Sequence, residues 1–302
     1  MKHETGNWHM RRSFKRTGPL RSSKVIGLAI ILSFLSLTCQ GEDVTRGIPP
    51  TTVAFYQIDT DAAWSPDGKS ILFVKGDWPD SAWVGGIYLH DLATGRDSLI
   101  SRNYLASSLT WSPDQKWIAF SQGAQIYTMK LNGDSLTQIT SSGSNFRCRW
   151  SPRANRIVYD VSSIGLWLSD RDGKNKRLVY EHAGHTDWFA DGVRLAGLGL
   201  GAEVYILDTL GDRYDRITST GLLKSNSVAV SPDGTAVVFV QKLQVWIVKV
   251  DGSNLTQLTV NGGDWPDWSP DGKWIVYTNG GDKNGHLWLM KPDGSEKHQI
   301  TF

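Results

Sequence analysis

Trp64-Ser65-Pro66-Asp67-Gly68 is the first of six similar pentapeptides in a chain of 302 residues. The other five copies occupy residues 111–115, 150–154, 188–192, 230–234 and 268–272. Successive copies begin 47, 39, 38, 42 and 38 residues apart, and a repeat of roughly 40 residues is the length of one blade of four antiparallel strands. Within the pentapeptide, proline presets φ for the second turn position, and glycine accepts the left-handed conformation that closes a hairpin. The motif is therefore a turn.

The same order of segments follows each pentapeptide. An apolar strand such as residues 71–73 comes first, and then a loop and a second strand such as residues 126–127. After an Asn-Gly or Asp-Gly turn, a closing strand ends in Ile-Thr or Leu-Thr, as at residues 139–140, 258–259 and 300–301. Most of the 14 tryptophans head a pentapeptide or lie in a predicted strand, where large aromatic side chains bury area between blades. The sequence predicts an all-β fold, a six-bladed β-propeller of four-stranded antiparallel blades.

These repeats resemble the propeller blades of the TolB family, which carry the same Trp-Ser-Pro-Asp-Gly before an apolar strand, an Ile-Tyr strand and a terminal Leu-Thr. The resemblance covers residues 63–302, although the third copy lacks Asp-Gly, the fourth lacks Ser-Pro, and Val230 replaces tryptophan in the fifth. It implies a periplasmic propeller that binds protein partners in the bacterial envelope. TolB also has an α/β domain before its propeller, whereas only residues 40–61 intervene here, so we expect a stand-alone TolB-like propeller.

The N-terminal segment predicts export. Six basic residues within 11–24 precede an apolar run at residues 25–37, which is shorter than the ~20 residues of a bilayer span and is typical of a secretory signal. Cys39 follows this run and resembles the lipidated cysteine of bacterial lipoproteins, although Ser36 and Thr38 stand where that signal prefers Leu and Gly or Ala. An ordinary signal with an incidental Cys39 and an uncleaved anchor are the alternatives.

These signals divide the chain into three parts. Residues 1–39 are the expected signal peptide or lipoprotein signal, residues 40–61 a linker with a candidate latching strand at 52–58, and residues 62–302 the propeller. We expect the exported protein in the periplasm or lipid-anchored at the outer membrane. The formal net charge is +2, and the basic excess lies at the N-terminus, which argues against nucleic acid as a partner. Cys148 lies in a predicted strand, where we expect a buried side chain; a reactive thiol is the alternative.

The positions of the long loops indicate which face of the propeller is the binding face. When a blade starts at its innermost strand, the pentapeptide turn and the Asp-Gly turn lie on one face, which we call the signature face. The second-to-third loops and the blade crossings lie on the opposite, loop-rich face. The longest irregular segments fall there, at residues 75–86, 141–145, 181–187, 261–267 and 279–286. We expect binding on the loop-rich face, because loops on a rigid scaffold carry function.

Two copies of Gly-Asp-Trp-Pro-Asp, at residues 76–80 and 263–267, supply candidate contact residues in these loops. The candidates are Asp77, Trp78, the nearby Trp83, Asp264 and Trp265. Loop tryptophans beside carboxylates suit recognition of a protein or a sugar. The alternative is packing, in which Trp265 leads into the sixth innermost strand and Trp78 folds back over its loop.

Four histidines raise the question of a metal. His182 and His185 could form half of a site that His90 or His286 completes, and oligogalacturonate lyases, which resemble this architecture, use propeller-borne histidines with a divalent metal. His182 and His185 are expected in a loop, and His90 in a strand of another blade. We therefore predict no metal and no cofactor, and we keep His182, His185 and His286 as partner-binding candidates.

The sequence also lacks the Gly-x-Ser-x-Gly elbow of hydrolases. We predict a non-enzymatic, monomeric envelope protein that binds one or more envelope proteins through its loop-rich face or central channel. A glycan is a further candidate partner, and contact with the membrane is expected only through the N-terminal lipid or signal. The alternative is a metal-dependent carbohydrate-binding or lyase-like propeller.

Overall fold

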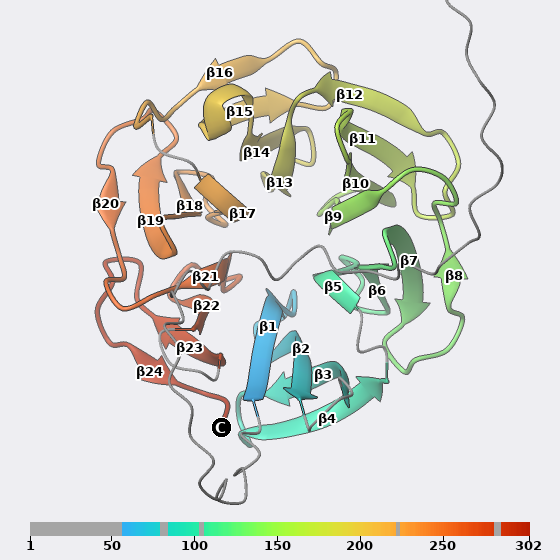
Figure 1. The fold of residues 1–302 in the computed structure, drawn as a ribbon, viewed down its shortest axis with the longest axis vertical. Helices are drawn as coiled ribbons and strands as arrows, with labels where there is room; N and C mark the ends of the chain where they lie inside the picture. Colours follow the sequence, from blue (N-terminus) through green and yellow to red (C-terminus); the bar gives the residue numbers. More distant parts are fainter. Residues whose placement is uncertain (1–55, 79–83, 103–105, 222–223, 281–284) are drawn as a thin grey trace, which may run out of the picture. The chain divides into compact units, whose positions relative to one another are not determined.

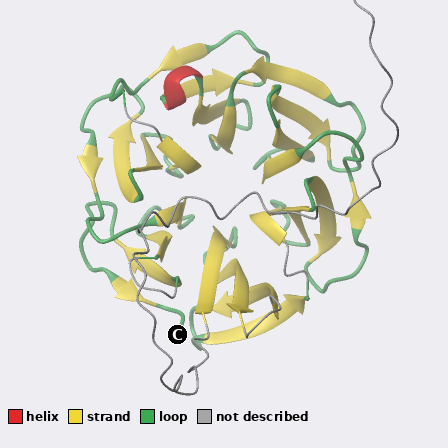
Figure 2. Ribbon diagram, in the orientation of Figure 1, coloured by secondary structure: helices red, strands yellow, loops and turns green. Residues whose placement is uncertain are grey.

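The computed structural model describes residues 56–302 except 79–83, 103–105, 222–223 and 281–284. These residues belong to one compact unit, Thr52–Phe302. Within it, six sheets of four antiparallel strands stand around a central axis (Figure 1). Figure 2 shows that loops connect the strands and that the described helix is a single short turn, η1 (Leu200–Ala202). The predicted six-bladed β-propeller is confirmed. No helix in the described part of the chain is long and apolar enough to span a membrane.

Each blade is built from four consecutive strands, with the first strand innermost. Blades 1 to 3 comprise β1 (Tyr56–Trp64), β2 (Ser70–Trp78), β3 (Val84–Asp91), β4 (Arg96–Ser101); β5 (Ala106–Trp111), β6 (Trp117–Gln122), β7 (Gln125–Lys130), β8 (Thr137–Gln138); and β9 (Asn145–Trp150), β10 (Arg156–Val161), β11 (Gly165–Asp170), β12 (Arg177–Glu181). Blades 4 to 6 comprise β13 (Gly184–Trp188), β14 (Arg194–Leu198), β15 (Val204–Asp208), β16 (Tyr214–Arg216); β17 (Lys224–Val230), β18 (Ala236–Gln241), β19 (Gln244–Lys249), β20 (Thr256–Gln257); and β21 (Asp264–Trp268), β22 (Ile275–Asn279), β23 (His286–Met290), β24 (His298–Gln299).

The pentapeptide forms the turn between the first two strands of each blade. In blade 1, Ser65 Oγ donates a hydrogen bond to Asp67 Oδ1 (2.7 Å) and accepts one from Ser70 N (3.0 Å). Gly68 has a φ of 71°, as the motif requires. Blades 2, 5 and 6 repeat the Ser–Asp bond at 2.5–2.7 Å. In blade 6 the serine hydroxyl and neighbouring donors lower the pKa of Asp271 to about 2. The motif is structural, as predicted.

The hydrophobic core lies between neighbouring blades. One cluster combines Leu72 of blade 1 with Ile118 of blade 2, and another combines Phe73 of blade 1 with Val276 of blade 6. The five tryptophans that head a pentapeptide are all buried, with at most 8% of their surface exposed. Flat aromatic side chains therefore fill the space between adjacent sheets, which confirms the packing role predicted for them.

The threonine at the end of a blade forms hydrogen bonds with the start of the third strand. In blade 2, Thr140 Oγ1 accepts a hydrogen bond from Ile126 N (2.9 Å) and donates to Gln125 Oε1 (2.8 Å). Blade 5 repeats this with Thr259, which donates to Gln244 Oε1 at 2.9 Å. The threonine of the closing Leu-Thr or Ile-Thr therefore bonds to the first two residues of the third strand.

The ring closes between blades 6 and 1, where the terminal threonine has a different hydrogen-bond acceptor. In blade 6 the third strand begins with His286, and Thr301 Oγ1 donates instead to Asp59 Oδ2 of β1, at 2.5 Å. Asp59 N donates to Gly285 O (2.7 Å), and Ile58 forms a parallel bridge with Gly285. The strand anticipated at residues 52–58 is thus, from residue 56 on, the start of the innermost strand of blade 1, and it also contacts the last blade. No strand is exchanged between the described parts of blades 1 and 6.

Candidate functional site

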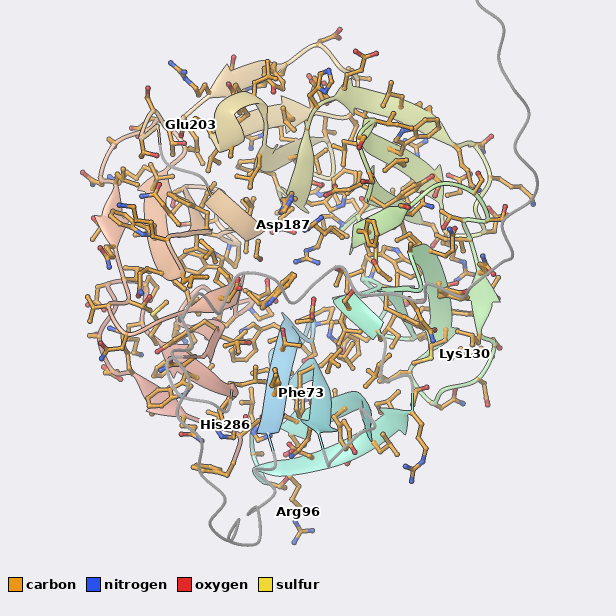
Figure 3. All side chains as sticks on the ribbon, in the orientation of Figure 1. Phe73, Arg96, Lys130, Asp187, Glu203 and His286 are labelled. Carbon is orange, nitrogen blue, oxygen red and sulfur yellow. The ribbon has the colours of Figure 1, made fainter. Side chains whose placement is uncertain are left out.

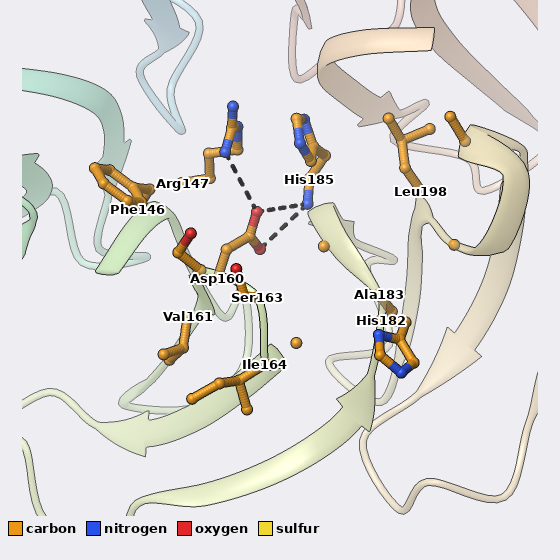
Figure 4. Close-up of a pocket in the computed structure, with 15 residues that line it drawn as sticks. Phe146, Arg147, Asp160, Val161, Ser163, Ile164, His182, Ala183, His185 and Leu198 are labelled. Carbon is orange, nitrogen blue, oxygen red and sulfur yellow. Dashed lines mark hydrogen bonds and ion pairs between the residues drawn. The ribbon is translucent and has the colours of Figure 1, made fainter. Parts of the chain in front are cut away.

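A pocket of about 420 Å³ opens on the loop-rich face between blades 3 and 4 (Figure 4). Its walls are the β10–β11 turn at residues 162–164, the crossing at residues 182–184, and the segment 198–202 that includes η1. All three are second-to-third loops or blade crossings, so the pocket lies opposite the signature turns. Its volume is in the range of ~300–1,000 Å³ that small-ligand sites occupy.

Arg147, Asp160 and His185 form the floor of the pocket (Figure 4). Asp160 accepts a hydrogen bond from the backbone N–H of His185 (2.9 Å to Oδ2), and Arg147 NH1 lies 3.8 Å from the same oxygen. Burial raises the pKa of Asp160 to about 7, although the His185 N–H and two arginines act in the opposite direction. A Cβ on Gly184 would lie 2.7 Å from Asp160 Oδ2, so glycine is needed there.

The innermost strands carry a feature that sequence reasoning missed. In each innermost strand the pairing with the second strand shifts register. In five of these strands, one described residue has a positive φ. It lies three positions before the first residue of the pentapeptide. These five residues are Asp61, Ser108, Arg147, His185 and Trp265, with φ between 51° and 57°. A β-bulge re-aims a side chain, and four of the five line a narrow cavity of about 10 Å³ inside the ring. Their fixed spacing from the pentapeptide is the signal that could have identified them.

A second pocket of about 380 Å³ lies at the signature-face end of the channel. Asp187 and Asp267 line it, each one residue before a pentapeptide, and their carboxylates accept the backbone N–H of Val230 and Trp64 in the next blade (both 2.8 Å). Burial and the charge of Asp187 raise the pKa of Asp267 to about 7. Figure 3 shows Asp187 near the centre of the ring. These carboxyl groups join neighbouring blades, and they line the signature-face end of the channel together with Arg149.

The structure separates the predicted histidines. His182, in the crossing, and His185, in β13 instead of the expected loop, both line the pocket between blades 3 and 4. His286 begins β23 at the junction of blades 6 and 1, where its Nδ1 lies 3.5 Å from Asp59 Oδ2. His90 lies in β3 of blade 1, a strand of another blade as predicted. Its side chain is buried, and its Nδ1 lies 2.8 Å from Asp97 Oδ1. Within the described ranges, no group of three or more His, Cys, Asp or Glu side chains is placed to hold a metal.

The predicted loop positions of the Gly-Asp-Trp-Pro-Asp segments are wrong. Asp264 and Trp265 lie in β21, the innermost strand of blade 6, because its bulge accommodates this sequence; the packing alternative for Trp265 had placed it at this strand. Asp77 and Trp78 end β2, where Trp78 pairs with Tyr56 and Asp77 with Val84. The side chains of Asp77 and Trp78, and all of Trp83 and Cys39, lie outside the described residues.

Cys148 is a free and fully buried cysteine in β9, as expected from its position. Burial raises the pKa of its thiol to about 12. Because the thiolate is the reactive form, we predict that native protein with Cys39→Ser shows no reaction with dithionitrobenzoate, and that one thiol per chain reacts after unfolding in guanidinium. Rapid labelling of the native variant would contradict this and support the reactive-thiol alternative.

Comparison with known proteins supports the same architecture. The family described as the N-terminal region of dipeptidyl peptidase IV matches residues 65–149. The solved structure of a putative TolB from Agrobacterium tumefaciens superimposes with a TM-score of 0.63 and 21% identity, covering 69% of this chain and 85% of that chain. The fold is that of a TolB-like β-propeller. The resemblance recognised in the pentapeptide repeats is therefore confirmed at the level of fold.

Relatives of this TolB-like propeller have varied descriptions. It is 27% identical over 194 residues to Atu1656, an uncharacterized protein of Agrobacterium fabrum, and 25% identical over 231 residues to the uncharacterized peptidase YuxL of Bacillus subtilis. These alignments cover 56% and 72% of this chain, but only 64% and 29% of the two relatives. An oligogalacturonate lyase in complex with manganese superimposes with a TM-score of 0.54 at 15% identity, over 80% of this chain and 91% of that chain. This last similarity concerns the fold alone.

Proposed function

We propose that this TolB-like propeller is a non-enzymatic scaffold of the bacterial envelope that binds a protein partner through its loop-rich face and the adjoining channel. The difference between the two faces carries the proposal. Hydrogen bonds between Ser and Asp keep four of the signature turns short and regular. On the opposite face a pocket of about 420 Å³ opens beside the channel-lining Arg147 and His185.

The surroundings of this pocket suit a protein contact. Ile164 on its rim is 47% exposed, and Phe146 and Leu198 add apolar surface beside the charged floor. An apolar anchor next to a few oriented polar groups is typical of a binding hot spot. The expected export signal and the periplasmic setting of TolB-like proteins support a partner in the envelope, with this chain in the periplasm or tethered to the outer membrane through Cys39.

The histidines give little support to the alternative of a metal-dependent carbohydrate-binding or lyase-like propeller. His182 and His185 share the pocket, but His286 lies at the junction of blades 6 and 1. Neither the distances nor the burial of the described histidines favours that function over a scaffold.

A pair of charge substitutions on opposite faces tests the proposed scaffold. We expect the full-length protein, cross-linked in the envelope of the bacterium that makes it, to enrich a specific partner, and Ile164→Glu to reduce this enrichment about tenfold by placing a charge at the contact. Leu210→Glu is the matched control, because Leu210 is 71% exposed in the β15–β16 turn on the signature face. Equal effects of both substitutions, or loss only with Leu210→Glu, would contradict binding at the loop-rich face.

A further inference from the structure

The pocket floor holds a donor and an acceptor side by side with unused hydrogen-bonding capacity. Arg147 NH1 and Asp160 Oδ2 are 3.8 Å apart, which is an ion pair but too long for a hydrogen bond. Among the described residues, Arg147 Nε has no hydrogen-bond partner, although it is buried. Asp160 accepts only the backbone N–H of His185 in the described structure. A buried donor without a hydrogen-bond partner costs free energy, so the site favours a ligand that accepts a hydrogen bond from this arginine.

The charges of this pair favour a neutral ligand. Arg147 would attract an anionic ligand, but Asp160 would repel it. Asp160 would attract a cationic ligand, but Arg147 would repel it. Burial raises the pKa of Asp160 to about 7, so its carboxyl group is present in both forms near neutral pH. A hydroxyl group can donate to the carboxylate and accept from the carboxylic acid, whereas an ammonium group depends on the carboxylate.

The walls favour a ligand that is partly apolar. Phe146, Val161 and Leu198 line the sides, and the exposed His182 adds a polar edge. A sugar ring combines C–H faces, which pack on aromatic and aliphatic side chains, with adjacent hydroxyl groups. The 420 Å³ volume is that of a small-ligand site.

We propose that the pocket between blades 3 and 4 binds a neutral sugar, with two adjacent hydroxyl groups bridging Arg147 and Asp160. One hydroxyl accepts a hydrogen bond from the Arg147 guanidinium group, and its neighbour donates to the Asp160 carboxyl group. The ligand thereby replaces the open 3.8 Å gap with two hydrogen bonds. The site shares Arg147 with the channel, and its rim is the surface proposed above for the protein contact, but sugar binding does not require that partner.

Saturation-transfer NMR on the full-length protein tests the site, with the methyl glycosides of glucose, galactose and mannose as probes. We expect saturable binding of at least one glycoside with a dissociation constant in the millimolar range. Arg147→Met should weaken that binding about tenfold, because it removes the donor and keeps most of the side-chain volume. Ser163→Trp, an exposed change on the pocket wall, should also weaken it, and it provides a second test if Arg147→Met fails to fold.

Arg156→Met is the matched control. Arg156 Nε also lies 3.8 Å from a carboxylate, that of Asp170, in the same blade but outside the pocket. We expect it to bind the glycoside as the wild type does. The proposal is wrong if no glycoside binds saturably, if Arg156→Met weakens binding as much as Arg147→Met, or if free glycine or acetamide binds better than all three glycosides.

Discussion

Replacing Asp59 with alanine is expected to destabilise the whole propeller, because this residue closes the ring. Its carboxyl group accepts the Thr301 hydroxyl, and its backbone bonds to Gly285 and Thr278 of the last blade. Alanine leaves the buried Thr301 hydroxyl without its acceptor, which costs roughly 3 kcal/mol. In a domain of this size the midpoint of thermal unfolding should fall by about 10 °C.

Gln244→Ala is the control for this effect. Gln244 accepts the hydroxyl of Thr259 in the equivalent position of blade 5, but within a single blade. We expect a loss of about 1 kcal/mol there, because the bond joins strands that are already paired. Asp59→Asn keeps an acceptor for Thr301 and should fall between the two. If Asp59→Ala and Gln244→Ala lower the midpoint equally in calorimetry, Asp59 has no special role in closing the ring.

The repeat made the fold predictable, because its turn chemistry is local. Each Ser-Pro-Asp-Gly determines its hairpin through contacts within a few residues, and the spacing of the copies then sets the number of blades. The junction between blades 1 and 6 could not be predicted in this way. Asp59 and Thr301 are 242 residues apart, and nothing in the local sequence indicates that an aspartate in β1 replaces the acceptor that Gln125 and Gln244 supply in other blades.

The candidate site was only partly predictable. Residues 181–187 were predicted as a loop, but only residues 182–183 form the blade crossing and residues 184–187 belong to β13. The bulges of the inner strands were missed because no glycine marks them. Aspartate, serine, arginine, histidine and tryptophan all occupy the same left-handed position. The two Gly-Asp-Trp-Pro-Asp segments show the same limit. The first segment begins within the last residues of β2, and the second contains the bulge of β21. The position of the segment within the repeat therefore determines its structure, whereas its loop-like composition does not.

The stability of the propeller is expected to fall as the pH rises from about 4 to 7. Burial raises the pKa of Asp61 to about 6 and that of Asp160 and Asp267 to about 7, whereas an unfolded aspartate titrates near 3.9. Between these values the folded state holds more protons than the unfolded state, so the free energy of unfolding decreases with pH. We expect a decrease on the order of a few kcal/mol, measured as urea unfolding at pH 4.5 and 7.5.

Asp267→Asn should flatten this dependence, because the amide keeps an acceptor for Trp64 N and has no proton to lose in this range. Asp233→Asn is the control, since hydrogen bonds from Ser231 and Thr235 lower the pKa of Asp233 and its contribution is lost only below about pH 4. It should shift stability by a similar amount at both pH values. Stability that is constant or rises from pH 4.5 to 7.5 would mean that burial does not hold the pKa values of these carboxyl groups above those of the unfolded chain, and the prediction would then be wrong.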